Sequence, residues 1–324
     1  MKFILSISLL LCSSLLFAQS KTPGPKEEAV APFLPELFSQ FPNVRDLTIS
    51  PDGNQMYFTL QSYRRGQVFI VGMHKEEGKW RKPEVAPFSG RYNDVEPAFA
   101  PDGLKLFFCS NRPLSDTIQE PKDVDIWYVE RKDFDSPWSK PVNIGAPINT
   151  ANNEYYPSLT TSGKLYYTAQ RDDSKGGEDI YVSQWQQGSY TTPVSLPQTI
   201  NSELGEFNAF IAPDDSYLIF SSYGRKDDLG NGDLYISFRD REGKWSPAKN
   251  LGSSINTKEI EYCPFVDTKT QTLYFTSSRN KIPKFFDQAQ NLEQILKCMN
   301  QCENGLNRLY RVSVRKLLKD NKQP

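Results

Sequence analysis

Residues 94–112 of this chain read DVEPAFAPDGLKLFFCSNR, and this stretch decides the fold. A short apolar run leads into Ala100-Pro101-Asp102-Gly103, and a second apolar run, Leu106-Phe107-Phe108, follows. Proline fixes its own φ near about −65°, and an Asp-Gly pair tolerates the positive φ of a tight turn. The stretch therefore predicts two antiparallel strands joined by a tight turn.

The same pattern recurs along the chain at intervals of about 50 residues. We align five copies, each beginning with an acidic residue: 46–65, 94–112, 154–171, 206–225 and 261–279. A third strand follows in these copies, as in Ile126-Trp127-Tyr128, and a turn containing Trp or Tyr and then Pro leads to a fourth. Four antiparallel strands per repeat, repeated radially, predict the blades of a β-propeller.

The two ends of the repeat array predict how it closes. The fifth copy stops after Val312-Ser313-Val314 without a fourth strand, whereas residues 32–41 before the first copy have the composition of one. Pairing them removes the open edge of a linear array. We therefore predict an all-β fold: a single five-bladed β-propeller of four-stranded antiparallel blades, closed by an N-terminal strand, with one helical insertion in the last blade.

The segments outside the repeats give the domain organisation. Lys2, an apolar run from Phe3 to Phe17 and Ala18 predict a signal peptide at 1–18. A linker (19–31), the propeller (32–316) and a polar tail (317–324) follow. Within the propeller, residues 281–307 carry apolar residues at helical spacing. They predict a helix of some four turns, ending near Asn304-Gly305, that packs on the propeller or docks a partner.

Composition and motifs exclude several classes of protein. The net charge is −1, from 38 basic and 39 acidic residues, which argues against a nucleic-acid partner. The chain has one histidine and lacks nucleophile-elbow, phosphate-loop and dinucleotide signatures. We therefore predict no catalytic residue, no metal site and no cofactor. The thiols of Cys109, Cys263, Cys298 and Cys302 leave three disulfide connectivities open.

One constellation could carry chemistry or binding. Each repeat begins with an acid, and each carries an arginine after its second strand. The acids are Asp46, Asp94, Glu154, Glu206 and Glu261, and the arginines of the last four copies are Arg112, Arg171, Arg225 and Arg279. Carboxylates around a channel mouth could hydrolyse glycosides or hold Ca²⁺. Their recurrence beside arginine instead favours a repeated structural ion pair.

The repeat resembles the WD40-like β-propeller repeat family, which includes the TolB-like propellers. The resemblance rests on Ser50-Pro51-Asp52-Gly53 with Tyr57-Phe58, on Ala100-Pro101-Asp102-Gly103, on Ser110-Asn111-Arg112 and on Asp179-Ile180-Tyr181. It covers nearly the whole chain after the signal peptide. It departs from the six-bladed members that carry an extra N-terminal domain.

The resemblance implies a binding or scaffold module of the bacterial cell envelope. We therefore expect a non-catalytic, monomeric protein, periplasmic or secreted through a cleaved signal peptide. No transmembrane segment is expected after cleavage, and the expected partner is a protein of the cell envelope. The alternative is a glycoside hydrolase-like or carbohydrate-binding propeller that uses the channel-mouth carboxylates, with a glycan as its ligand.

Overall fold

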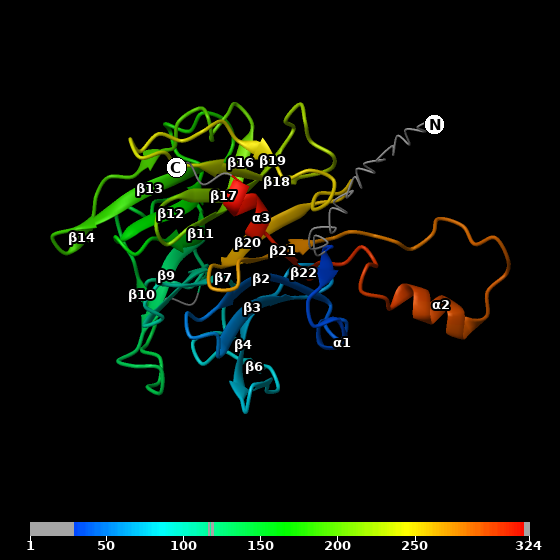
Figure 1. The fold of residues 1–324 in the computed structure, drawn as a ribbon. Coiled ribbons are helices and arrows are strands. Elements are labelled where there is room, and N and C mark those ends of the chain that lie inside the picture. Colours follow the sequence, from blue (N-terminus) through cyan, green and yellow to red (C-terminus); the bar gives the residue numbers. More distant parts are fainter. Residues whose placement is uncertain (1–28, 116, 118–119, 321–324) are drawn as a thin grey trace, which may run out of the picture.

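The computed structural model describes residues 29–115, 117 and 120–320, and it confirms a five-bladed β-propeller. Five antiparallel sheets (Figure 1) are arranged in a ring in which the innermost strands of successive sheets are in contact. The predicted signal peptide and most of the linker lie outside the described residues.

The strands follow the order expected for blades, with the innermost strand first. Blade 1 holds β2 (Asn43–Ile49), β3 (Gln55–Gln61), β4 (Val68–Glu76), β5 (Lys79–Trp80) and β6 (Glu84–Val85). Blade 2 holds β7 (Asp94–Phe99), β8 (Lys105–Ser110), β9 (Asp125–Glu130) and β10 (Val142–Asn143). Blade 3 holds β11 (Glu154–Leu159), β12 (Lys164–Ala169), β13 (Asp179–Gln186), β14 (Ser189–Tyr190) and β15 (Val194–Ser195). Blade 4 holds β16 (Gly205–Ile211), β17 (Tyr217–Tyr223), β18 (Asp233–Phe238) and β19 (Lys249–Asn250).

Blade 5 joins the two ends of the chain. Its inner strands are β20 (Glu261–Asp267), β21 (Thr272–Ser277) and β22 (Arg308–Ser313), and β1 (Ala31–Pro32) pairs with β22 as its fourth strand. The pairing region is shorter than the predicted residues 32–41, because α1 (Pro35–Phe38) follows at once. The buried ring of Phe38 packs edge-on against Phe58 of blade 1 at 5.1 Å. The closure therefore also fills the crevice between blades 5 and 1.

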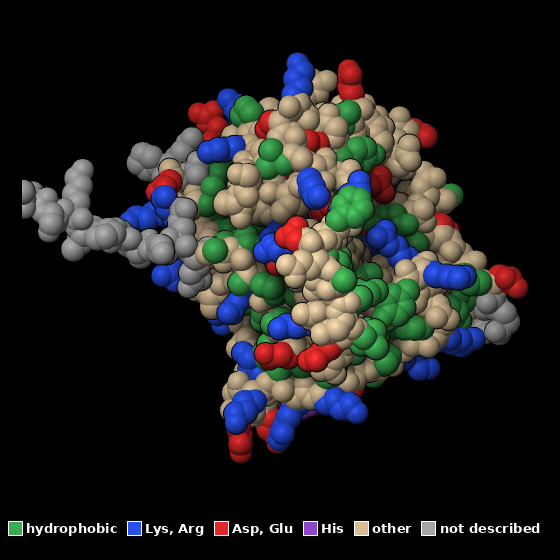
Figure 2. Space-filling model, turned by 90° about the vertical axis from the view of Figure 1, so that its right-hand side faces the viewer, with side chains coloured by type: hydrophobic (Ala, Val, Ile, Leu, Met, Phe, Trp, Pro, Cys, Tyr) green, Lys and Arg blue, Asp and Glu red, His purple; other side chains and the backbone are tan. Residues whose placement is uncertain are grey.

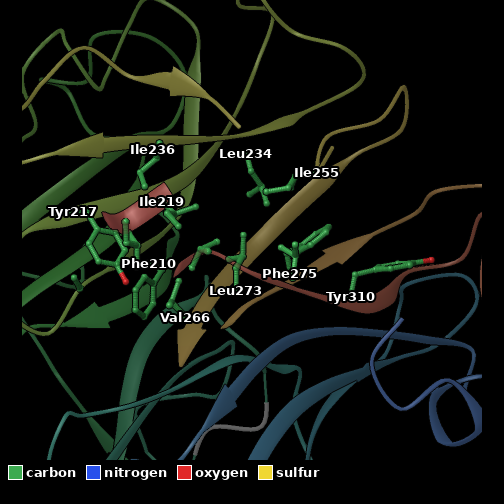
Figure 3. Close-up of a cluster of buried hydrophobic side chains, with 14 residues drawn as sticks. Phe210, Tyr217, Ile219, Leu234, Ile236, Ile255, Val266, Leu273, Phe275 and Tyr310 are labelled. Carbon is green, nitrogen blue, oxygen red and sulfur yellow. The ribbon is translucent and has the colours of Figure 1, made fainter. Parts of the chain in front are cut away.

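Hydrophobic side chains fill the crevices between neighbouring blades, with one buried cluster in each of the five. Figure 3 shows the cluster between blades 4 and 5, with Tyr217 toward one end and Tyr310 at the other. Burial of this apolar surface is the main force that holds the ring of blades together.

Each innermost strand carries a β-bulge at the same position. The register of β7 and β8, for example, shifts between Val95 and Ala98. The first residue of each bulge has a left-handed φ between 49° and 59°, although none is a glycine: these bulge residues are Asp46, Glu96, Tyr156, Asn208 and Cys263. Since a β-bulge changes the direction in which the side chains of its strand point, the residue at this position determines which side chain faces the channel.

The insertion in blade 5 differs from its prediction. Its helix, α2, spans only Leu292–Met299 and projects away from the propeller (Figure 1). The side chains of Asn291 and Gln294 form a capping box that starts the helix. The helix ends at Asn300, and the side chain of Asn304 bonds the carbonyl of Met299. No residue of α2 is buried, so the helix does not pack on the propeller.

The C-terminal segment is also more ordered than a polar tail. Residues Arg315–Asp320 form α3, and the side chain of Leu318 is buried in the cluster between blades 4 and 5. Residues 321–324 of the predicted tail lie outside the described residues.

Candidate functional site: the repeat acids and the central channel

Four of the five predicted acids occupy one equivalent position, near the start of the innermost strand. Asp94, Glu154, Glu206 and Glu261 each pair with the last or next-to-last residue of the second strand. All four are fully buried rather than exposed around a channel mouth. Each accepts a hydrogen bond from a hydroxyl of the loop that arrives from the preceding blade: Ser89, Thr150, Ser202 and Thr257.

Three of the four arginines form the ion pair that the repeat suggested. Arg112 lies 2.6 Å from Asp94, Arg225 lies 2.7 Å from Glu206, and Arg279 lies 3.4 Å from Glu261. The same guanidinium groups donate to the carbonyls of Phe88, Ile200 and Ile255 in the incoming loops. They also stack on aromatic rings of their own blades. The acid and arginine therefore clamp each incoming loop onto its blade.

Blade 3 breaks this pattern. Arg171 donates to the carbonyls of Pro147 and Ile148 and to the Tyr167 hydroxyl rather than to Glu154. The residue opposite Glu154 is Ala169, whereas the other three blades have a serine whose hydroxyl bonds both the acid and the arginine Nε. Burial raises the pKa of Glu154 to about 7, against the hydrogen bonds from Thr150.

The fifth predicted acid, Asp46, does not belong to this set. In blade 1 the equivalent position, opposite Leu60, holds Val44, and Asp46 lies two residues further on, at the bulge. Asp46 precedes its turn by four residues, whereas Asp94 precedes its turn by six, so the two acids occupy different positions on their strands. The arginines of the first copy, Arg64 and Arg65, lie in an exposed loop.

The bulge residues link neighbouring blades around the channel. The backbone N–H of Asp46 donates to Thr276 Oγ1 of blade 5, that of Glu96 to Thr59 Oγ1 of blade 1, and that of Asn208 to Thr168 Oγ1 of blade 3. In blade 2 the equivalent of these threonines is Cys109, and there the N–H of Tyr156 donates to the Glu96 carboxylate at 2.7 Å instead. The Glu96 carboxylate thus accepts a hydrogen bond from Tyr156 in the way that threonine hydroxyls accept one from Asp46, Glu96 and Asn208.

A charged cluster lies in the channel around Arg45. Its Nε donates to Asp46 Oδ1 at 2.7 Å, and its Nη2 donates to Glu96 Oε1 at 2.8 Å. The same guanidinium lies 5.0 Å from the centre of the Tyr262 ring. Glu96 also accepts from Asn208 Nδ2 at 3.3 Å. Side chains of blades 1, 2, 4 and 5 therefore contribute to one buried network.

The protonation of Glu96 is set by two opposed effects. Burial, together with the neighbouring Asp46, raises the pKa of Glu96 to about 7, while Arg45 and the N–H of Tyr156 oppose the rise. A carboxyl group with a pKa near neutrality can exchange a proton at physiological pH. Asp46 and Glu96 are almost completely buried, however, so neither carboxylate is open to bulk solvent.

A cavity of about 290 Å³ opens from this cluster toward the Pro-Asp-Gly turns. Glu96 and Tyr156 line its inner end, and Pro97, Pro157 and Pro264, each directly after a bulge residue, line its wall. The Tyr156 hydroxyl donates to the Pro264 carbonyl at 3.0 Å, which joins two sides of the cavity. The cavity is of a size to hold one small ring, with mostly apolar walls, Glu96 at its inner end, and Asp267 and Lys269 also in its lining.

Within residues 29–115, 117 and 120–320, no group of three or more His, Cys, Asp or Glu side chains could hold a metal ion. No helix in these ranges is long and apolar enough to cross a bilayer. The four cysteines of these ranges are all free thiols.

No protein-family model matches the chain. No curated protein matches it either. Solved structures do resemble it. A putative TolB from Agrobacterium tumefaciens is 15% identical with a TM-score of 0.46, over 77% of this chain and 74% of that one. A glycoside hydrolase is 8% identical with a TM-score of 0.53, over 83% and 86%. An α-L-arabinofuranosidase from Lactobacillus brevis is 12% identical with a TM-score of 0.48, over 85% and 93%. At these identities the likeness shows the propeller fold alone.

Proposed function

We propose that this protein is a non-catalytic, exported β-propeller that acts as a monomer in the bacterial cell envelope and binds another protein there. One observation carries the proposal: the insertion of blade 5 presents an apolar surface to solvent. This insertion surface consists of Phe285, Phe286, Leu292, Leu296 and Met299, with Phe285 79% and Leu292 70% exposed.

The arrangement of the insertion surface favours a protein as its ligand. Leu292, Leu296 and Met299 share one face of α2, while Glu293 and Lys297 lie on the other, as in helices that bury one side against a partner. Figure 2 views the molecule from the side where the insertion projects and shows hydrophobic side chains gathered in the middle of that face. Exposed apolar clusters of this kind mark interaction sites in soluble proteins.

The carboxylates of the propeller also favour binding over catalysis. Three of the repeat acids are neutralised by arginine, and all four are buried beneath loop hydroxyls. Hydrolysis of a glycosidic bond requires two carboxyl groups placed on either side of the bond. The acids of the repeats are satisfied by the protein itself, which leaves the propeller as a rigid platform for the insertion.

Site-specific photo-crosslinking tests the proposal. A benzophenone amino acid placed at Leu296 should cross-link one protein in cells of the producing organism. The same group at Lys297, one residue away on the polar face, should not. Replacing Phe285 and Leu292 with serine should abolish the product, whereas replacing Glu293 with glutamine should leave it. Equal products from positions 296 and 297, or none from either, would contradict the proposal.

A second candidate function rests on Glu96. This carboxyl group has a pKa raised to about 7 and lines the channel cavity, where it could donate a proton to the leaving oxygen of a bound glycan. A screen of the purified protein on aryl glycosides and polysaccharides tests it. Activity that Glu96→Gln abolishes would favour this candidate. Inactivity of the wild type, or equal residual activity in Glu96→Gln, would exclude it.

A further inference from the structure

The crevice between blades 3 and 4 opens into a cavity of about 700 Å³. The charged side chains in its wall are all cationic: Lys164, Arg239 and Lys244. No acidic residue of the described chain lines it. The apolar part of the wall consists of Tyr166, Val182, Val194, Leu196 and Trp245. A wall of this composition favours a ligand that is both apolar and negatively charged.

The crevice between blades 1 and 2 shows how the equivalent polar groups are satisfied elsewhere in the propeller. The Trp138 Nε1–H donates to the Tyr57 hydroxyl at 2.8 Å. The guanidinium of Arg131 donates through Nε and Nη2 to the Gly103 carbonyl and through Nη1 to Gln55 Oε1. Every side-chain nitrogen of this tryptophan and this arginine is therefore bonded within the protein.

The crevice between blades 3 and 4 has the same tryptophan, tyrosine and arginine, and one additional acid. By their places on the paired strands and in the turns, the residues equivalent to Trp138, Tyr57, Arg131 and Gln55 are Trp245, Tyr166, Arg239 and Lys164. Asp215 takes the place of Gly103 in the tight turn. Its carboxylate accepts from the Tyr166 hydroxyl at 2.7 Å, from Lys164 Nζ at 2.5 Å and from Arg239 Nη1. The tyrosine and the arginine are therefore engaged by Asp215.

This arrangement leaves two N–H donors free. The Trp245 Nε1–H and the Arg239 Nη2 form no hydrogen bond within residues 29–115, 117 and 120–320. The polar atoms of these residues that are fully buried without a partner do not include either nitrogen, so both have surface open to solvent. The two side chains are adjacent, with the guanidinium carbon 5.6 Å from the centre of the indole ring. One ligand can therefore accept a hydrogen bond from each.

The ion pairs beside the cavity leave an excess of positive charge. Lys164 and Arg239 share the single carboxylate of Asp215, and neither forms a second ion pair among the described residues. Lys244 pairs only with Glu242, and both of these side chains are exposed. An anion bound in the cavity would neutralise the charge that Asp215 leaves unbalanced, through charge-assisted hydrogen bonds.

We propose that the cavity between blades 3 and 4 binds a carboxylate carried on an apolar chain or ring. The carboxylate accepts from Trp245 Nε1 and Arg239 Nη2, and its apolar body lies against the wall that includes Val194 and Leu196. The volume lies within the ~300–1,000 Å³ of ordinary ligand pockets. The lining belongs to neither the insertion surface nor the channel network, so this site does not depend on the proposed function.

Saturation-transfer NMR titrations on the full chain test the site with four probes: 3-phenylpropanoate, 3-phenylpropanamide, 3-phenylpropylamine and a blocked tripeptide that ends in a free phenylalanine carboxylate. We expect the propanoate to bind and the amine not to bind. The amide should bind about tenfold more weakly than the propanoate, because it lacks the charge. Binding of the tripeptide as well assigns the site to the C-terminus of a peptide, whereas binding of the propanoate alone assigns it to a free carboxylate.

A pair of tryptophan variants separates this site from binding elsewhere on the protein. Trp245→Phe keeps an aromatic ring in the crevice and removes the free N–H, so the affinity for the propanoate should fall about three- to tenfold. Trp138→Phe removes the N–H that is bonded to Tyr57 and should leave the affinity unchanged. No binding of the propanoate, equal binding of the propanoate and the amide to the wild type, or equal losses in the two variants would overturn the proposal.

A pair of lysine variants tests the charge. Lys164→Gln gives blade 3 the side chain that Gln55 supplies in blade 1, and it should reduce the preference for the propanoate over the amide severalfold. Lys105→Gln, at the equivalent position of β8, should preserve that preference. An unchanged preference in Lys164→Gln would contradict the proposal. Because Lys164 is partly exposed, this test stands even if Trp245→Phe fails to fold.

Discussion

Two positions on the same innermost strands, only two residues apart, behave in opposite ways. The acid position holds Asp94, Glu154, Glu206 and Glu261, and three of its four members form one repeated clamp with arginine. The bulge position keeps its backbone geometry in all five blades, yet its side chains are Asp, Glu, Tyr, Asn and Cys.

This contrast shows which positions of the repeat serve the structure of each blade and which contribute to one site shared by the blades. Every blade has to hold an incoming loop, and the same ion pair does so in blades 2, 4 and 5. The channel is a single space that the blades share, so side chains of blades 1, 2, 4 and 5 and a backbone N–H of blade 3 form one network around Arg45 and Glu96. Repetition therefore marks structural residues, and variation at a fixed backbone position marks the candidate site.

The largest expected effect comes from removing the centre of the channel network. Arg45→Met leaves Asp46 and Glu96 buried without their cation. Removal of one partner from a buried ion pair costs about 3–5 kcal/mol. We expect the free energy of unfolding, measured with urea, to fall by about that much. Arg65→Met, in the exposed loop, is the control and should change it by less than about 0.5 kcal/mol.

The next effect compares two arginines of the repeated clamp. Arg112→Met removes an ion pair with a fully buried carboxylate and should cost about 3 kcal/mol. Arg171→Met removes bonds to carbonyls and to a tyrosine hydroxyl and a cation–π contact with Tyr181, but no ion pair, and should cost about 1 kcal/mol. Urea unfolding of both variants measures the difference. Equal losses would show that Arg171 is paired with Glu154 in solution and that blade 3 is no exception.

Much of this architecture is readable in the sequence, for a physical reason. The tight turn between the first two strands has strict backbone requirements, so Pro-Asp or Gly recurs there in the first four copies and helps to reveal the blades. The clamp needs opposite charges, so acid and arginine recur together. Closure by an N-terminal strand follows from the missing fourth strand of the last copy, and β1 confirms it.

The channel network was not predicted, because a bulge constrains the backbone and leaves the side chain free. Asp46 was assigned to the wrong set since it is the nearest acid before its turn. Counting back four residues from Ser50, Ala100, Thr160, Ala212 and Asp267 reaches every bulge residue. That count, made on the turns instead of the acids, is the signal that would have found Glu96 and Cys263. The predicted helix of the insertion is longer than α2, because apolar spacing does not show where a capping box starts a helix.

A smaller effect is expected in the dependence of stability on pH. The pKa of Glu154 is about 7 in the folded protein, against an ordinary value of 4.5, so the folded state holds this proton more tightly than the unfolded chain does. Stability should therefore fall as the pH rises from about 4.5 to about 7, with a slope of at most about 1.4 kcal/mol per pH unit from this group.

Urea unfolding at several pH values measures that slope. Glutamine cannot ionise, so the free energy of unfolding of Glu154→Gln should decrease less than that of the wild type over this pH range. Part of the decrease should remain, because the pKa of Glu96 is also raised. Glu130→Gln, at an exposed glutamate, should keep the slope of the wild type. An unchanged slope in Glu154→Gln would mean that its carboxyl group is paired in solution, as in the other blades.

The smallest effect comes from restoring the missing serine of blade 3. Ala169→Ser places a hydroxyl opposite Glu154, where Ser110, Ser222 and Ser277 stand in the other blades and hold both the acid and the arginine Nε. The hydroxyl should bond to the Glu154 carboxylate, draw Arg171 toward it and lower the pKa of Glu154 below about 7. The gain in stability at pH 7 should be under about 1 kcal/mol, since the buried site must also accommodate an extra oxygen atom. A ¹³C-detected titration of the Glu154 carboxyl in both proteins measures the shift directly. If the pKa stays where it is, the serine is not what aligns the clamp, and the difference between blade 3 and the others must come from the loop that carries Pro147 and Ile148.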